Sequence, residues 1–188
     1  MDGGVQELLI GHKVRLRQKC LGDVFDDYAW RRDAELSRLS ATTPLLGSFA
    51  DYLKSYAEEP RCLGKGHRRF AIESMDGKHI GNCAYFNVDN TTGEAELGIV
   101  IGERAYWNYG YGADVVTTLL DYIFSQTKLN RIYLRTLGRN VRARRCFEKC
   151  GFIPHGQFIW EGCNFLIMDI SRSARHIAEL SSKLVRFE

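Results

Sequence analysis

The 188-residue sequence has no apolar run long enough to cross a membrane. Its longest runs, Leu8–Ile10 and Leu97–Ile101, fall far short of the ~18 residues that a membrane-spanning helix requires. The N-terminus has no basic leader with a cleavage site, and Asp2 stands where N-myristoylation requires glycine. We therefore expect a soluble, cytoplasmic protein without a membrane partner.

Metal-binding and disulfide patterns are also missing. The six cysteines contain no C-x-x-C pair and the five histidines contain no H-x-x-x-H pair. We expect neither a metal site nor a disulfide framework, and we expect reduced, mostly packed thiols. Cys146 and Cys150 lie one helical turn apart, where core packing is favoured over redox chemistry.

The charge is modest overall but unevenly distributed. A net charge of +3 argues against a dedicated nucleic-acid binder. Between Arg131 and Lys149, however, seven basic residues stand against the single acid Glu148. This run indicates that an anionic group binds nearby, although a solvated basic helix face or a nucleic-acid-binding module would also account for it.

Length and composition are those of one globular domain, with 45% hydrophobic and 26% charged residues. We predict an α/β (α+β) fold with a mixed, largely antiparallel sheet flanked by helices, in residues 1–172, followed by a C-terminal helical appendage, 173–188. Hydrophobic periodicity and turn residues predict the individual elements. The expected strands are 14–17, 69–74, 79–86, 95–101, 131–136, 152–160 and 164–170, and the expected helices are 23–39, 48–59, 110–127 and 140–149.

The segment Tyr106–Asp114 is the most informative one. Gly110 and Gly112 lie at the mouth of an apolar-periodic helix that follows a strand, where free backbone N–H groups and the helix dipole favour a phosphate. The sequence contains no Walker loop, and Val115 replaces the third glycine of a dinucleotide-binding fingerprint. Both of these nucleotide folds are therefore disfavoured.

The same stretch, YWNYGYG at 106–112, resembles motif A of the GNAT superfamily of acetyl-coenzyme A dependent N-acetyltransferases. It is most similar to the form Y-W-G-x-G-Y-G/A of the ribosomal-protein alanine N-acetyltransferase branch, with Asn108 in place of a glycine. The segment Asn140–Phe152 resembles a second motif of that superfamily, N-x-x-S/A-x-x-x-Y/F-E-K-x-G-F. The resemblance covers roughly residues 12–172.

The resemblance implies a splayed sheet that holds acetyl-coenzyme A between the strands at 94–101 and 131–136. It implies that backbone groups of Ile99, Val100 and Ile101 pair with the pantetheine arm. Asn140 would lie near the same arm, and it would also cap its own helix. Arg142 and Arg145, which share a helix face, would bind the 3′-phosphate in preference to Arg144. The residues implied for the pyrophosphate are Asn108, Tyr109, Gly110, Tyr111, Gly112 and Ala113.

Glu96 is the predicted general base, acting through a water molecule on the attacking amine. The alternative is an exposed strand glutamate without a catalytic role. Backbone N–H groups near Ile99 would stabilise the oxyanion. Phe147 and Ala143 occupy the positions where relatives place a tyrosine or a serine as the acid, so we expect direct attack without a dedicated acid. A non-catalytic acyl-coenzyme A binding protein is the alternative function.

The acceptor amine stays open at this point. A protein N-terminus, a polyamine and an aminoglycoside are all compatible with the sequence, as is a homodimer. The acceptor pocket is expected within residues 23–60, whose carboxylates would suit a cationic amine, although most of them are expected on solvated helix faces. These carboxylates are Asp26, Asp27, Asp33, Glu35, Asp51, Glu58 and Glu59.

Overall fold

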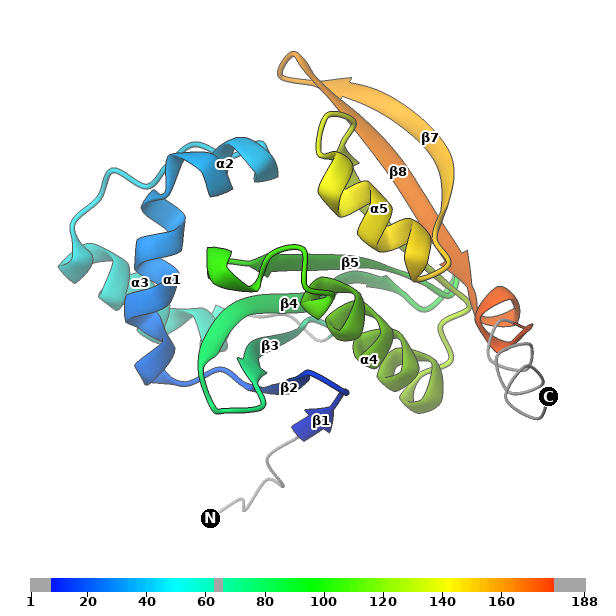
Figure 1. The fold of residues 1–188 in the computed structure, drawn as a ribbon, viewed down its shortest axis with the longest axis horizontal. Coiled ribbons are helices and arrows are strands. Elements are labelled where there is room, and N and C mark those ends of the chain that lie inside the picture. Colours follow the sequence, from blue (N-terminus) through cyan, green and yellow to red (C-terminus); the bar gives the residue numbers. More distant parts are fainter. Residues whose placement is uncertain (1–7, 63–65, 178–188) are drawn as a thin grey trace.

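A computed structural model of the chain describes residues 8–62 and 66–177, which form one sheet of eight strands flanked by helices (Figure 1). The strands follow the order β1-β2-β3-β4-β5-β6-β8-β7 across the sheet. Their bounds are β1 Leu8–Ile10, β2 Val14–Gln18, β3 Arg68–Ser74, β4 His79–Asp89, β5 Glu94–Ile101, β6 Arg131–Leu137, β7 Ile153–Trp160 and β8 Cys163–Ser171. The helices are η1 Leu21–Asp23, α1 Val24–Arg32, α2 Ala34–Ser40, α3 Phe49–Cys62, η2 Arg104–Tyr106, α4 Tyr111–Gln126 and α5 Val141–Lys149.

The sheet is splayed at the one parallel pair found among the described strands. All other neighbouring strands are antiparallel, whereas β5 and β6 run parallel and pair only from Glu94–Arg131 to Glu96–Tyr133. Beyond Glu96 the two strands diverge, while β5 stays paired with β4 as far as Ile101. This arrangement confirms the predicted mixed, largely antiparallel and splayed sheet.

Helices α4 and α5 pack against each other on one face of the sheet (Figure 1). The predicted apolar positions of α4 are all buried in the core, and each such side chain contributes roughly 1.5–3 kcal/mol by leaving water. They are Val115, Val116, Leu119, Leu120, Ile123 and Phe124. None of the helices within the described ranges is long and apolar enough to span a lipid bilayer.

The sequence predicted one continuous helix over 23–39, and this prediction was wrong. The backbone of Asp33 is extended, and its carboxylate accepts hydrogen bonds from the N–H groups of Glu35 and Leu36. Asp33 therefore ends α1 and caps α2, because a short carboxylate competes well for the free N–H groups of a first helical turn.

Other elements also differ from the prediction, and β4, for example, continues to Asp89, beyond the predicted end at 86. Helix α3 continues through Pro60 to Cys62, because a proline near the end of a helix removes only one N–H···O bond. The apolar run Leu8–Ile10 forms the edge strand β1, which the prediction missed. Residues 172–177 are helical, and the rest of the predicted appendage, 178–188, lies outside the described residues.

Candidate functional site

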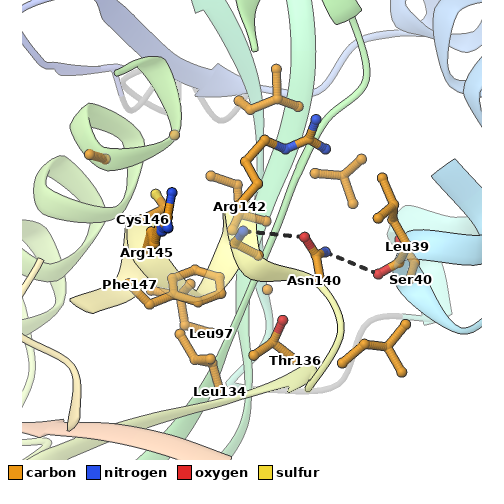
Figure 2. A pocket seen from close by; sticks show the side chains of 18 of the residues that line it. Leu39, Ser40, Leu97, Leu134, Thr136, Asn140, Arg142, Arg145, Cys146 and Phe147 are labelled. Carbon is orange, nitrogen blue, oxygen red and sulfur yellow. Dashed lines mark hydrogen bonds between the residues drawn. The ribbon is translucent and has the colours of Figure 1, made fainter. Parts of the chain in front are cut away.

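A cavity of about 660 Å³ lies where β5 and β6 diverge. Its walls come from α2, β5, the loop before α4, β6 and α5 (Figure 2). Most of the predicted site residues line it: Glu96, Ile99, Val100, Ile101, Asn108, Gly110, Gly112, Ala113, Asn140, Arg142 and Arg145. Of the other two, Tyr109 is 69% exposed and Tyr111 packs its ring edge-on against Tyr106.

The glycine loop before α4 presents a helix N-terminus to the cavity. Gly110 is the N-cap residue of α4 and has a φ of +85°, a left-handed conformation that glycine adopts without strain. Asn108 has a φ of +67°, and asparagine is the residue that best replaces glycine in this conformation. The replacement therefore keeps the backbone turn, and the first N–H groups of α4 have no acceptor within the helix.

Asp114 anchors this helix start to the β1–β2 turn. Its carboxylate accepts three backbone hydrogen bonds, from the N–H groups of His12, Lys13 and Val14, at 3.1, 2.7 and 3.2 Å. A negative side chain in the first turn of a helix also interacts favourably with the helix dipole. These hydrogen bonds hold the glycine loop next to the turn between β1 and β2.

Strand β5 has an edge without a strand partner on the β6 side from Leu97 to Ile101. Those of its backbone groups that point away from β4 have no strand partner there, and one of them is bonded to a side chain. The indole N–H of Trp107 donates to the carbonyl of Ile101 at 2.7 Å. This bond occupies the carbonyl at the Ile101 end of the edge that was predicted to bind the pantetheine arm.

The basic residues of α5 separate into two sets. Arg142, Arg145 and Lys149 line the cavity, whereas Arg144 donates to the carbonyl of Gly138 at 3.2 Å. The guanidinium of Arg142 lies over the indole ring of Trp107, 3.4 Å from the ring centroid, and burial lowers the pKa of Arg142. Arg145 and Lys149 are therefore the cations on this wall that are not stacked on the indole.

Asn140 joins α5 to α2. Its side-chain carbonyl accepts from the N–H of Ala143 at 3.2 Å, which confirms the predicted helix cap, and its amide donates to the carbonyl of Leu39 at 3.3 Å (Figure 2). Arg139 donates to the neighbouring carbonyl of Arg38, also at 3.3 Å. The C-terminal carbonyls of α2 are thereby satisfied by the start of α5.

The other end of α2 is tied to the loop after β5. Arg104 donates to both carboxylate oxygens of Asp33, at 2.8 and 2.6 Å, and pairs with Glu35 at 3.0 Å. Arg104 therefore holds the start of α2, and Arg139 and Asn140 hold its end. Leu36 and Leu39 of this helix line the cavity.

Glu96 lies at the point where the strands separate. It is 5% exposed, and its two oxygens accept hydrogen bonds from the Nε and Nη2 atoms of Arg135, both at 2.8 Å. The amide of Asn87 donates to the same carboxylate at 3.1 Å. The exposed strand glutamate of the alternative interpretation is therefore wrong: Glu96 is buried, ion-paired and part of the cavity wall.

No proton-donating side chain occupies the two positions where relatives place a tyrosine or a serine as the acid. Phe147 and Ala143 both line the cavity. Tyr106 also lines it, whereas the phenol of Tyr133 lies outside, and burial raises the pKa of Tyr133. The five cysteines whose side chains are described are free. Cys146 lines the cavity, and a hydrogen bond with Cys150 raises the pKa of the Cys146 thiol.

The predicted acceptor carboxylates do not reach the cavity. None of those with a described side chain lines it. Asp26 pairs with His79, Asp27 with Lys19, and Asp33 and Glu35 with Arg104, while Asp51 accepts from Ser48 at the start of α3.

Comparison with known proteins decides the family. Residues 13–153 match the family model of the acetyltransferase (GNAT) domain. The chain belongs to the GNAT acetyltransferase family. This GNAT chain is accordingly an N-acetyltransferase, as the two motifs predicted.

Two curated relatives support the same family. An uncharacterized N-acetyltransferase, p20, of Bacillus licheniformis is 26% identical over 151 residues, covering 80% of the GNAT chain and 84% of the relative. The spermidine N(1)-acetyltransferase of Vibrio cholerae is 29% identical over 94 residues, covering 50% of the GNAT chain and 54% of the relative.

Solved structures share the GNAT fold. Spermidine N-acetyltransferase from Vibrio cholerae, in complex with CoA and spermine, has a TM-score of 0.76 at 24% identity, covering 87% of the GNAT chain and 98% of that chain. The aminoglycoside acetyltransferase AAC(6')-Ib, in complex with coenzyme A, has a TM-score of 0.73 at 18% identity, with coverages of 88% and 99%. These relatives do not single out the ribosomal-protein alanine branch.

Three residues of the GNAT site were missed by sequence reasoning. Lys149 follows Arg142 and Arg145 at helical spacing, so periodicity alone would have placed it on the same face. Trp107 was considered only as part of the motif at 106–112, and its contact with Arg142 has no local signal in the sequence. Arg135 meets Glu96 through strand pairing, which the sequence does not display.

Proposed function

We propose that this protein transfers the acetyl group of acetyl-coenzyme A to a primary amine by direct attack. Family membership and the cavity at the strand divergence support the proposal. The observation that carries it is the alignment of three features along one cavity: the free edge of β5, the helix N-terminus behind Gly110 and the cations of α5.

Each part of acetyl-coenzyme A has a matching wall in this proposal. The backbone of Ile99 and Val100 would pair with the pantetheine arm. The first N–H groups of α4 would bind the pyrophosphate, where the helix dipole favours negative charge. Arg145 and Lys149 would bind the 3′-phosphate, since the guanidinium of Arg142 is stacked on Trp107.

Glu96 is the proposed base. A carboxylate has about four acceptor positions, and the bonds from Arg135 and Asn87 use three of them, so one position is left for a water molecule. The amine nitrogen forms a bond to the thioester carbonyl carbon while its proton passes through that water to Glu96. The C–S bond then breaks, and the coenzyme A thiolate leaves without an acid because a thiol has a pKa of ~8.5.

The relatives indicate the chemical class of the acceptor and do not identify one compound. The related enzymes named above are called spermidine and aminoglycoside acetyltransferases, and the motif form of the ribosomal-protein alanine branch adds a protein N-terminal amine. All three are primary amines, and that shared chemistry is what the proposal includes.

Calorimetry with acetyl-coenzyme A, NAD and ATP tests the binding part of the proposal. We expect saturable binding of acetyl-coenzyme A alone. Release of free thiol in the presence of a panel of amines tests the transfer. Binding without thiol release would favour the non-catalytic acyl-coenzyme A binding protein, and salt-sensitive binding of oligonucleotides would favour a nucleic-acid module.

A further inference from the structure

Much of the cavity wall is apolar, and we place the acceptor against the part that α2, β4 and β8 contribute. Leu36 and Leu39 of α2 face it from one side, with Phe86 of β4 and Phe165 of β8 on the sheet side. The ring of Phe165 is extended by that of Phe158, which stacks on it at 5.2 Å. Such walls suit an apolar body, and they hold no carboxylate that could pair with a chain of ammonium groups.

Glu96 is the only acid among the described residues that line the cavity, which also include Arg135, Arg142, Arg145 and Lys149. Both of its oxygens are already engaged by Arg135. The nearest carboxylates along the same sheet face, Glu94 and Asp169, lie outside the cavity and pair with Arg131. Arg145 and Lys149 lie on the wall proposed for the 3′-phosphate and Arg142 is stacked on Trp107, so the charges beside the proposed base are those of Arg135 and Glu96. A polycation would therefore find no second carboxylate there.

The guanidinium of Arg135 can bind a second group in addition to Glu96. It uses Nε and Nη2 for Glu96, its side chain is 46% exposed, and within the described residues no partner is found for Nη1. The Nη1 group points away from the carboxylate because the guanidinium is planar and forked. A second anion can therefore dock on Arg135 beside the proposed base.

We infer that the acceptor is a monoamine with an apolar body and a carboxylate next to the amine, as in a free hydrophobic amino acid, and that Arg135 selects it. The inference rests on the proposed acetyl transfer. The acceptor amine would approach the water on Glu96 while its carboxylate binds Nη1 of Arg135. Its side chain would pack between Phe86, Phe165 and α2.

Matched acceptors test the inference. Phenylalanine and phenethylamine share the same body and differ by the carboxylate, and spermidine represents the polycations. We expect kcat/KM for phenylalanine to exceed that for phenethylamine by roughly ten- to a hundredfold, the usual effect of one charge-assisted contact. Spermidine should be the poorest of the three.

The variant Arg135→Met should remove the preference for phenylalanine. Because both acceptors need the same proton transfer, damage to Glu96 lowers both values and leaves their ratio unaffected. Arg135→Lys keeps a charge beside Glu96 if the methionine variant does not fold, and it should reduce the ratio to an intermediate value. Arg131→Met, on the same strand and face but outside the cavity, should leave the ratio at its wild-type value.

Three results would overturn the inference: spermidine as the best acceptor, an unchanged ratio in both Arg135 variants, or phenylalaninamide accepted as well as phenylalanine. Failure of the proposed acetyl transfer itself would be recognised by another result. In that case no amine releases thiol from acetyl-coenzyme A, although the cosubstrate binds, and the inference falls with it.

Discussion

The guanidinium of Arg142 lies 3.4 Å from the ring centroid of Trp107, so that α5 and the loop before α4 touch across the cavity. Arg104 approaches the same indole at 5.7 Å and also holds the N-cap residue of α2. Trp107 thus connects the wall proposed for the cosubstrate with the helix proposed for the acceptor. The contact also assigns different tasks to the arginines of α5.

The first prediction separates those tasks. Arg145→Ala should weaken acetyl-coenzyme A by roughly ten- to a hundredfold and a 3′-dephospho analogue much less, because only the former carries the phosphate. Arg142→Ala should weaken both cosubstrates equally, since its loss disturbs Trp107. Calorimetric titration of the two variants with both compounds checks this.

Arg144→Ala is the matched control, because its guanidinium donates to Gly138 and does not line the cavity. It should bind both compounds as the wild type does. Equal losses in all three variants would leave only a diffuse positive field and would contradict a specific phosphate contact.

The second prediction concerns the glycine loop. A Cβ atom at Gly112 would lie 3.3 Å from the Cys146 sulfur and would stand at the helix N-terminus proposed for the pyrophosphate. Gly112→Val should abolish measurable binding of acetyl-coenzyme A, while the fold survives with a stability loss of about 1–3 kcal/mol. Binding is measured by calorimetry and folding by circular dichroism.

Gly156→Ala provides the comparison, since a Cβ atom there has no neighbour within 4 Å. It should keep full affinity. Wild-type affinity in a folded Gly112→Val protein would show that the pyrophosphate lies elsewhere.

The third prediction concerns Glu96. Replacing it by glutamine removes the proposed base, so turnover should fall by roughly 10²–10⁴ while acetyl-coenzyme A affinity is retained. Steady-state kinetics over a range of pH gives the turnover, and calorimetry gives the affinity.

Glu94→Gln serves as the control on the same strand and face, because Glu94 pairs with Arg131 and does not line the cavity. Its turnover should match that of the wild type. If both variants turn over equally fast, Glu96 has a structural role only.

The fourth prediction concerns stability in acid. Burial by itself would raise the pKa of Asp23, but hydrogen bonds from Arg17 and from the N–H of Cys20 lower it overall. A carboxyl whose pKa is lower in the folded state stabilises the fold above its unfolded pKa of ~3.9 and loses that effect as pH falls through the folded value. Asp23→Asn should therefore destabilise by about 3 kcal/mol at pH 7 and progressively less below pH ~4.

Urea unfolding at pH 7 and at about pH 3.5 measures this difference. Asp121→Asn is the control, because its pair with Arg175 is half-exposed and should contribute less than about 1 kcal/mol at either pH. A penalty for Asp23→Asn that does not change with pH would contradict the assignment.

The sequence by itself determined the features that depend on neighbours a few residues apart. The period of apolar residues predicted α4, turn residues predicted the strand pairs β3–β4 and β7–β8, and Asn140 predicted the cap of α5. Two motifs with glycines and an asparagine at set spacings were enough to indicate the family. Each of these signals is local, so one chain without a structure displays it.

Only the tertiary structure decided which distant groups meet. Glu96 and Arg135 are 39 residues apart and become partners because β5 and β6 start in parallel register. The amide of Asn140 reaches Leu39, 101 residues away, because the diverging strands leave α2 and α5 facing each other. Such contacts depend on strand register and on the angle of the splay, and neither is written in any local spacing of residues. For this reason the sequence indicated a carboxylate at the site, and the fold alone decided that an arginine neutralises it.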